Sequence, residues 1–184
     1  MARDKGLIPL NGRPLAGHAA DALAPQVDTI CINPPAAGLD AYRRLGHPLC
    51  PDPVPEQPGP LAGFLAGMHT PHPWIATVPC DSPTPPPDLV ARLFTACSDA
   101  GTTLAVARDP ERLHPVFALL HRHWRPTLLE ALASGERRAG VWLRAMGALE
   151  VEFTDGTAFA NINTPEDLAH WTGSDGGSLA GAGT

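Results

Sequence analysis

Positive charge is scarce in this chain, which carries 13 Lys and Arg residues against 19 Asp and Glu residues and a formal net charge of −6. Binding to the backbone of a nucleic acid needs a basic surface that displaces counterions from the phosphates. The charge balance therefore argues against a nucleic-acid partner, although it does not exclude small phosphorylated ligands. Long apolar runs are also missing, both after residues 1–5 and elsewhere. The sequence accordingly predicts no signal peptide, no membrane association and a cytoplasmic location.

Familiar metal-binding and nucleophile patterns are missing as well. No C-x-x-C pair occurs, so we expect neither a zinc site nor a disulfide framework but four reduced thiols, at Cys31, Cys50, Cys80 and Cys97. The histidines contain no H-E-x-x-H motif, and their closest pairs are His121-x-His123 and His69-x-x-His72, which make weak metal sites. No Walker A lysine loop, G-x-S-x-G string or Cys-His nucleophile pattern is present. The sequence thus offers no pattern typical of zinc enzymes, P-loop NTPases or covalent hydrolases.

Periodic segments are present, and they alternate between strand and helix. The 184 residues, 43% of them hydrophobic, can bury one core, and the 22 prolines and 18 glycines cluster between the periodic segments. We expect strands at 29–32, 48–50, 74–78, 103–107, 116–120 and 149–153, and helices at 14–23, 36–45, 60–68, 89–97, 127–133, 139–146 and 164–171. This alternation predicts an α/β fold with a mostly parallel sheet between two layers of helices. We expect one domain over residues 1–172 and a flexible tail rich in Gly, Ser and Ala at 173–184.

One carboxylate stands directly after the most apolar predicted strand. The string Pro79-Cys80-Asp81-Ser82-Pro83 follows the run 74–78. In open α/β sheets, ligands bind at the carboxyl ends of the strands, and a single Asp there is suited to hold a divalent metal against phosphate oxygens. The competing interpretation is that Asp81 caps the helix that follows the turn. Position alone favours neither interpretation.

Three more polar residues fall just after predicted strands or in connecting loops, where they would meet Asp81 at one edge of the sheet. Lys5 could neutralise a phosphate, although most terminal lysines are simply solvated. Asn33 and Asp52 could contact a base or ribose, and both could equally be ordinary turn residues. The string Glu136-Arg137-Arg138 could hold an anionic second substrate or form a solvated helix start.

Several strings of the chain resemble the molybdenum cofactor guanylyltransferases, a family within the wider group of sugar-nucleotidyltransferase-like enzymes. The resemblance runs from Met1 to about Trp171. Its anchors are Asp4-Lys5-Gly6-Leu7 with Leu10-Asn11-Gly12-Arg13-Pro14-Leu15, then Pro58-Gly59-Pro60-Leu61-Ala62-Gly63, then the Asp81 string, and finally Asn161-Ile162-Asn163-Thr164-Pro165-Glu166-Asp167-Leu168. The strings His114-Pro115 and Gly135-Glu136-Arg137-Arg138 also match. Four anchors in one order make the resemblance specific.

The resemblance implies a Rossmann-like nucleotidyltransferase fold and a reaction. GMP would pass from GTP to the phosphate of the molybdenum-bearing pterin, with Mg²⁺ as cofactor and pyrophosphate as the second product. Carried over by residue, it implies that Lys5 binds phosphate, that Asn33 and Asp52 contact the nucleotide, and that Asp81 is the magnesium ligand. It places Arg137, Arg138, Asn161 and Asn163 toward the pterin. Acceptor molybdoenzymes or their chaperones would be the implied protein partners.

The chain departs from the family at its amino terminus. Family members begin with a strand and a glycine-rich loop of the form L-A-G-G-x-S-x-R-M-G-x-D-K, and this sequence starts within the last positions of that pattern, so the first strand is missing from it. Those glycines let backbone amides wrap the triphosphate, and the strand would pair inside the sheet. We expect that the start codon was placed at an internal methionine; the other explanation is a truncated relative with impaired catalysis. We expect the 184-residue chain, without that strand and loop, to bind GTP weakly.

Two other functions compete with guanylyl transfer. A close variant would use CTP to make the cytosine dinucleotide form of the cofactor. A different class of function is a non-catalytic carrier that holds the pterin and delivers it to an acceptor enzyme, which the missing loop would favour. Asp81 and Lys5 argue against a carrier, because a carrier needs no metal ligand.

Overall fold

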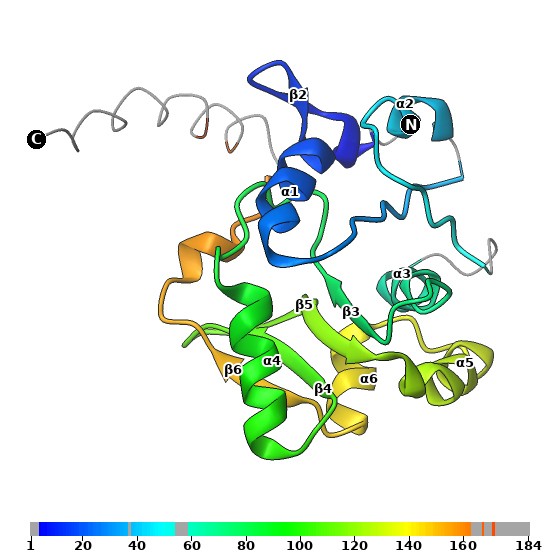
Figure 1. The fold of residues 1–184 in the computed structure, drawn as a ribbon, viewed down its shortest axis with the longest axis vertical. Coiled ribbons are helices and arrows are strands. Elements are labelled where there is room, and N and C mark those ends of the chain that lie inside the picture. The colour runs from blue at the N-terminus through cyan, green and yellow to red at the C-terminus, as the bar shows by residue number, and fades with distance from the viewer. Residues whose placement is uncertain (1–3, 37, 54–58, 163–166, 168–170, 172–184) are drawn as a thin grey trace, which may run out of the picture.

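A four-stranded sheet forms the centre of the computed structural model, which describes residues 4–36, 38–53, 59–162, 167 and 171 (Figure 1). The strand order is β3 (Trp74–Thr77), β5 (Leu113–His121), β4 (Leu104–Arg108) and β6 (Leu149–Glu152). β5 is antiparallel to both β3 and β4, whereas β6 is parallel to β4. β3, β4 and β6 therefore run in one direction, as the predicted alternation requires, and β5 runs in the other.

The direction of β5 follows from the length of its connection to β4. Residues 109–112 are all that separate the two strands, and a parallel crossover needs a dozen residues or more. The strands expected at 103–107 and 116–120 therefore form an antiparallel hairpin, and its register shifts between Val106 and Ala107. The hairpin brings the start of β5 to the same edge of the sheet as the ends of β3 and β4.

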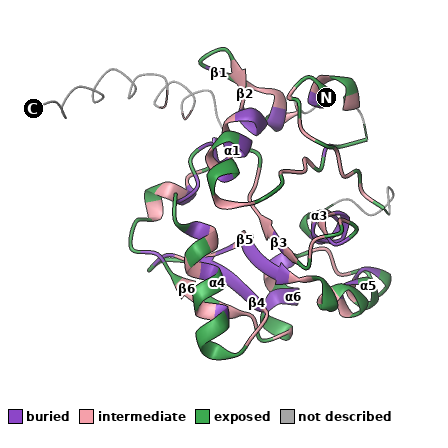
Figure 2. Cartoon of the chain, viewed as in Figure 1, coloured by how far each residue is buried: buried purple, intermediate pink, exposed green. Residues whose placement is uncertain are grey.

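Helices cover both faces of the sheet (Figures 1 and 2). Side chains alternate across β5, so that Ala118 and Leu120 belong to one buried cluster and Phe117 and Leu119 to the other. The first cluster includes side chains from α3 (Pro60–Gly67), α5 (Arg125–Ala133) and α6 (Ala139–Ala145). The second includes side chains from α4 (Leu89–Ala100) and the 3-10 turn η4 (Gly156–Phe159). This arrangement matches the predicted three layers, α/β/α.

The amino-terminal part packs as a smaller unit beside the sheet. It contains the 3-10 turns η1 (Lys5–Leu7) and η2 (Ala24–Gln26), the hairpin of β1 (Pro9–Leu10) and β2 (Arg13–Pro14), and α1 (Leu15–Leu23). Asn11 and Gly12 have φ angles of 50° and 80°, which confirms the turn expected there. Leu10 and Leu15 pack against Ile162, so the two ends of the described chain meet.

Three expected elements differ in the structure. The strands expected at 29–32 and 48–50 reduce to one parallel bridge between Ile32 and Leu49. The helix expected at 36–45 is shorter, because Gly38 has a φ of 97° and α2 (Leu39–Arg43) begins after it. A 3-10 turn, η3 (Arg122–Trp124), precedes α5. Most of the helix expected at 164–171, and all of the tail expected at 173–184, lie outside the described residues.

The prediction of four reduced thiols is wrong for two of them. Cys31 and Cys50 form a disulfide with a Cα–Cα distance of 6.0 Å, whereas Cys80 and Cys97 are free. The cysteines are 19 residues apart in sequence, and the parallel bridge at Ile32 and Leu49 places them side by side. A spacing pattern within the sequence could not reveal this contact. Among the described residues, no helix is both long enough and apolar enough to cross a bilayer.

A buried hydrogen-bonded pair, Asp109 and His114, closes the turn between β4 and β5. Asp109 accepts hydrogen bonds from the amides of Glu111 and Arg112 at 2.8 and 2.7 Å, and its other oxygen lies 2.7 Å from Nε2 of His114. The His114 ring stacks on Phe159 with centroids 4.2 Å apart. The Arg112 amide and His114 lower the pKa of Asp109 from 3.8 to about 2. The ionised carboxylate therefore stabilises the folded hairpin.

We predict that Asp109→Asn lowers the thermal unfolding midpoint at pH 7 by several degrees. A carboxyl whose pKa is depressed in the folded state contributes stability that is complete above its ordinary pKa of 3.8 and is lost as the pH falls through about 2. The gap between the variant and the unchanged protein should therefore narrow between pH 4 and pH 2. Thermal melts across this range test the prediction, with the exposed Asp99→Asn as control. A gap that stays constant with pH would contradict it.

Candidate functional site

Asp81 and Lys5 meet at the edge of the sheet where β3 ends. The chain leaves β3 at Thr77, and the Asp81 carboxylate oxygen Oδ2 lies 3.4 Å from Nζ of Lys5, although the two residues are 76 positions apart. The Asp81 side chain is 14% exposed and that of Lys5 is 48% exposed. The helix after the turn begins with Asp88 as its N-cap residue, so Asp81 is not the helix cap. The structure thus brings together the predicted phosphate-binding lysine and the predicted metal ligand.

Asn33 and Asp52 form a second pair. Nδ2 of Asn33 donates to Oδ1 of Asp52 at 2.8 Å and to the carbonyl oxygen of Cys50 at 2.7 Å. The two segments that carry these residues are joined by the Cys31–Cys50 disulfide and by the adjacent bridge between Ile32 and Leu49. Asn33 also lies against α3, because a Cβ placed on Gly63 would be 3.0 Å from its Oδ1. Glycine at position 63 therefore allows the close approach of the Asn33 amide to the helix.

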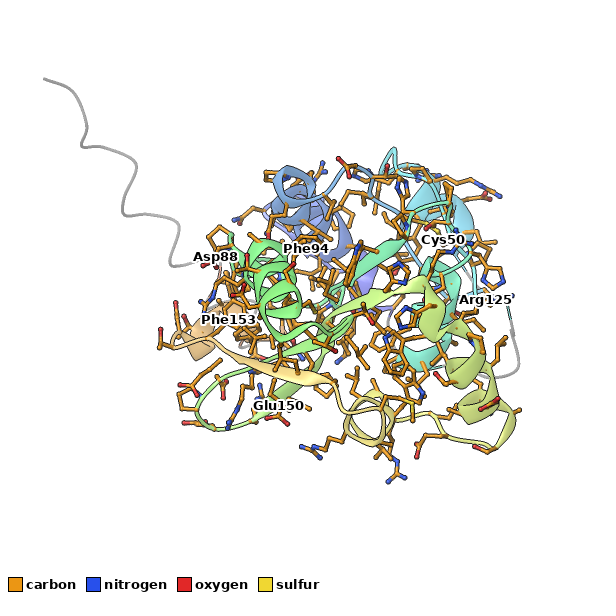
Figure 3. All side chains as sticks on the ribbon, turned by 60° about the horizontal axis from the view of Figure 1, so that its bottom comes forward. Cys50, Asp88, Phe94, Arg125, Glu150 and Phe153 are labelled. Carbon is orange, nitrogen blue, oxygen red and sulfur yellow. A yellow bond between two sulfur atoms is a disulfide. The ribbon has the colours of Figure 1, made fainter. Side chains whose placement is uncertain are left out.

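A cavity of about 760 Å³ lies beside both pairs. Asn33, Asp52 and the start of α3 line it, together with Asp4 and Cys80, which are the chain neighbours of Lys5 and Asp81. Its other walls are largely apolar and come from β3, α1, the segment 27–32 and α4; Phe94 of α4 and Cys50 both line it and are labelled in Figure 3. Within the described residues, β3 pairs with β5 alone, so its outer edge belongs to the cavity wall. The polar end of the cavity, where Asn33 and Asp52 lie, offers hydrogen-bonding groups to a small organic ligand.

Arg137 and Arg138 have local partners. Arg138 donates from its guanidinium to both carboxylate oxygens of Glu136 at 3.1 Å, and these bonds, with the amides of both arginines, lower the pKa of Glu136 to about 2. Nη1 of Arg137 donates to the carbonyl oxygens of Leu132 and Glu136 at 2.9 and 2.6 Å, beyond the last turn of α5. The Arg137 backbone lies next to Gly59, where α3 begins. The pair therefore sits close to the cavity, while both guanidinium groups already make hydrogen bonds.

Asn161 is held at the Asp81 turn. Oγ of Ser82, which is fully buried, lies 2.5 Å from Oδ1 of Asn161, and the amide of Ile162 donates to the carbonyl oxygen of Asp81 at 2.8 Å. Asn161 and Ile162, the first two residues of the carboxy-terminal anchor string, thus contact the Asp81 turn. Asn163 lies outside the described residues. The string around Asp81 does not predict this role for Ser82, because periodicity does not show that a serine is buried against an asparagine.

The carboxylates of the described residues do not form a complete metal cage. No group of three His, Cys, Asp or Glu residues that could hold a metal ion occurs among them. Mg²⁺ commonly binds through one or two carboxylates, with waters and substrate phosphates filling the other positions. A single partly exposed carboxylate, Asp81, beside a cavity fits that mode of binding. The residue types present are therefore compatible with a metal that arrives with a nucleotide.

Comparison with known proteins identifies the family. Residues 1–150 match the family model of the MobA-like NTP transferase domain. A molybdenum cofactor guanylyltransferase from Cupriavidus taiwanensis is 44% identical over 171 residues, covering 90% of this chain and 85% of that protein.

Solved structures share the fold. The molybdopterin-guanine dinucleotide biosynthesis protein A of Archaeoglobus fulgidus superposes with a TM-score of 0.74 at 20% identity, over 92% of this chain and 89% of that one. A Mycobacterium tuberculosis protein in complex with manganese superposes with a TM-score of 0.64 at 19% identity, over 94% of both chains. The predicted Rossmann-like α/β/α fold is thereby confirmed. The chain is a nucleotidyltransferase that belongs to the MobA-like NTP transferases and, among them, to the molybdenum cofactor guanylyltransferase family.

Proposed function

We propose that this protein transfers GMP from GTP to the phosphate of the molybdenum-bearing pterin cofactor and releases pyrophosphate. The observation that carries the proposal is the meeting of Lys5 with Asp81, 3.4 Å apart, beside a cavity that Asn33 and Asp52 also line. The relative from Cupriavidus taiwanensis, whose name states this activity, supports the choice of reaction. Cytoplasmic location and delivery to acceptor molybdoenzymes or their chaperones belong to the same proposal.

In this proposal the two residue pairs contact different parts of the nucleotide. The Asn33 amide and the Asp52 carboxylate offer hydrogen bonds to the nucleoside, while Lys5 offers a compact positive charge to the phosphates. An oxygen of the acceptor phosphate attacks the α-phosphorus of GTP. The bond from that phosphorus to the oxygen bridging to the β-phosphorus then breaks, and its electron pair leaves with pyrophosphate. Lys5 stabilises the negative charge that develops around the α-phosphorus, so catalysis is mainly positioning and electrostatics.

Asp81 is the residue that would hold a divalent cation, which we propose to be Mg²⁺. When bound, the cation supplies charge neutralisation to the phosphates. The manganese complex of the Mycobacterium tuberculosis protein supports a divalent metal in proteins of this fold. The arginines at 137 and 138 and the asparagines at 161 and 163 are proposed to face the pterin.

We predict that the protein releases pyrophosphate when it is incubated with GTP, Mg²⁺ and the pterin cofactor. GTP should be used in preference to CTP in direct competition, because the relative is named for guanylyl transfer. A coupled pyrophosphate assay measures both rates. Preference for CTP would favour the cytidylyl variant of the reaction. Cofactor binding without pyrophosphate release would contradict the enzyme and favour the carrier.

The carboxylate of Asp81 should be essential. We predict that Asp81→Ala lowers the rate of pyrophosphate release by roughly a hundredfold or more, the scale seen when one charge-stabilising group is removed from an active site. Raising the Mg²⁺ concentration should restore little of the rate. Asp99→Asn, an exposed change on α4, is the matched control and should leave the rate unchanged. Full activity of the alanine variant would contradict the proposed role of Asp81 as the metal ligand.

We further propose that the apolar part of the cavity, between β3 and the segment 27–32, accepts one more strand with the glycine-rich loop that family members place before Asp4-Lys5, and that the polar end with Asn33 and Asp52 is left to the nucleotide. Among the residues that the structure describes, the outer edge of β3 pairs with no strand, and this edge and the apolar walls support the proposal. We predict that a chain extended upstream by a strand and loop of the form L-A-G-G binds Mg-GTP at least about tenfold more tightly, because loop amides would reach the phosphates. Isothermal titration of both forms tests this. Equal and tight binding by the 184-residue chain would contradict it.

A further inference from the structure

The direction of the Lys5 side chain needs a physical cause. Lys5 is the only lysine in the chain, and nearly half of its side chain is exposed. The 3.4 Å contact with Asp81 requires that the Lys5 side chain starts from a Cα within reach of the Asp81 turn. The backbone of η1 therefore helps to decide whether the ammonium group can reach the carboxylate.

Asp4 fixes that backbone. Lys5 is the first residue of the short turn η1, and Asp4 is its N-cap. Oδ1 of Asp4 accepts the amide of Gly6 at 3.1 Å, while its own carbonyl oxygen accepts the amide of Leu7 at 3.2 Å. Asp4 thus accepts hydrogen bonds from both residues that follow Lys5. A shift of the Asp4 carboxylate would move the turn and, with it, the origin of the Lys5 side chain.

Tyr42 fixes Asp4. Its hydroxyl donates to Oδ1 of Asp4 at 2.8 Å from 38 residues along the chain, and the residue is 2% exposed. Burial and the Asp4 carboxylate raise the pKa of Tyr42 well above its usual value, so the hydroxyl keeps its proton and remains a donor.

The approach of the Tyr42 hydroxyl to the turn depends on glycine at position 6. A Cβ placed on Gly6 would overlap the hydroxyl oxygen and would lie 3.3 Å from Sγ of Cys80. A residue with a side chain there would displace Tyr42 from Asp4. Glycine at position 6 of the Asp4-Lys5-Gly6 string therefore leaves room for the Tyr42 hydroxyl beside Asp4.

We propose that Tyr42 is a positioning residue for the phosphate site, acting through Asp4 on Lys5. This inference rests on the proposed function, in which Lys5 binds the triphosphate. It also explains the course of the chain between Asn33 and Asp52. The segment leaves one nucleotide contact, passes through α2 to place Tyr42 under the phosphate end, and returns to the other contact. The two ends of the site are therefore linked by one continuous segment.

The single lysine allows a direct test without nucleotide. In protein labelled with ¹³C-lysine, Lys5 contributes the only labelled εCH₂ group. Its two protons have different chemical shifts when the side chain is fixed, and they share one chemical shift when the side chain rotates freely. We predict that Tyr42→Phe makes them coincide. The matched control is Trp124→Phe, which removes a donor to Oγ1 of Thr103 at the opposite edge of the sheet and should leave them apart. An unchanged Lys5 signal in folded Tyr42→Phe would overturn the proposal.

Nucleotide affinity shows whether positioning matters for binding. Tyr42→Phe should weaken Mg-GTP binding about tenfold when Lys5 is present and less than twofold in a Lys5→Ala background, because a residue that acts through Lys5 has no effect once Lys5 is gone. Equal losses in both backgrounds would mean that Tyr42 is merely structural and would overturn the proposal.

A failure of the proposed guanylyl transfer would give a different result from a failure of the Tyr42 proposal. If the unchanged protein does not bind Mg-GTP, guanylyl transfer is contradicted, and the Lys5 signal alone then decides whether Tyr42 positions it. Should Tyr42→Phe fail to fold, Gly6→Ala provides the same test, since its methyl group pushes the hydroxyl away from Asp4 and should free the Lys5 signal. A fixed Lys5 in Gly6→Ala would overturn the proposal.

Discussion

The contact between Lys5 and Asp81 is the interaction on which the site depends. It joins the amino-terminal unit to the end of β3, and so it places the only lysine of the chain at the edge of the sheet where β4 and β6 also end. A partly exposed ion pair stabilises a fold by about 1 kcal/mol or less. Packing, namely Leu10 and Leu15 against Ile162, holds the amino-terminal unit in place. The ion pair is therefore better understood as part of a binding site than as a source of stability.

The two ends of the cavity are built by different means. At the end proposed to hold the phosphates, a buried tyrosine and an N-cap aspartate define a three-residue turn. At the end proposed to hold the nucleoside, Asn33 and Asp52 sit on segments that share a single β-bridge. Their geometry comes from side-chain hydrogen bonds, the disulfide and the glycine at position 63 of α3. Neither end relies on a long strand. Both therefore depend on a few specific contacts, any of which a single substitution can remove.

Local sequence signals predicted much of the fold, and they also selected Lys5 and Asp81, which the structure places 3.4 Å apart. Periodicity gave α3, β3 and α4 with nearly their observed bounds, because each of these elements has a face defined by its own side chains. The antiparallel direction of β5 depends on the short connection at 109–112, which the alternation of strands and helices does not describe. The disulfide, the Tyr42 hydrogen bond and the capping of α5 by Arg137 join residues through contacts specific to this fold. Patterns within a segment carry no information about such contacts.

The charge of the site also explains why Lys5 and Asp81 should be paired before a nucleotide arrives. In a chain with a net charge of −6, an unpaired carboxylate at the cavity edge would repel a triphosphate. Pairing with Lys5 offsets that repulsion at short range. In the proposed reaction, Lys5 would exchange the carboxylate oxygen for phosphate oxygens of an entering nucleotide, and Asp81 would be the residue that holds the accompanying cation. Each residue then keeps an opposite charge beside it throughout, so neither has to be desolvated alone. The 3.4 Å contact in the free protein is thus compatible with rapid binding, since weak, partly exposed pairs break at little cost.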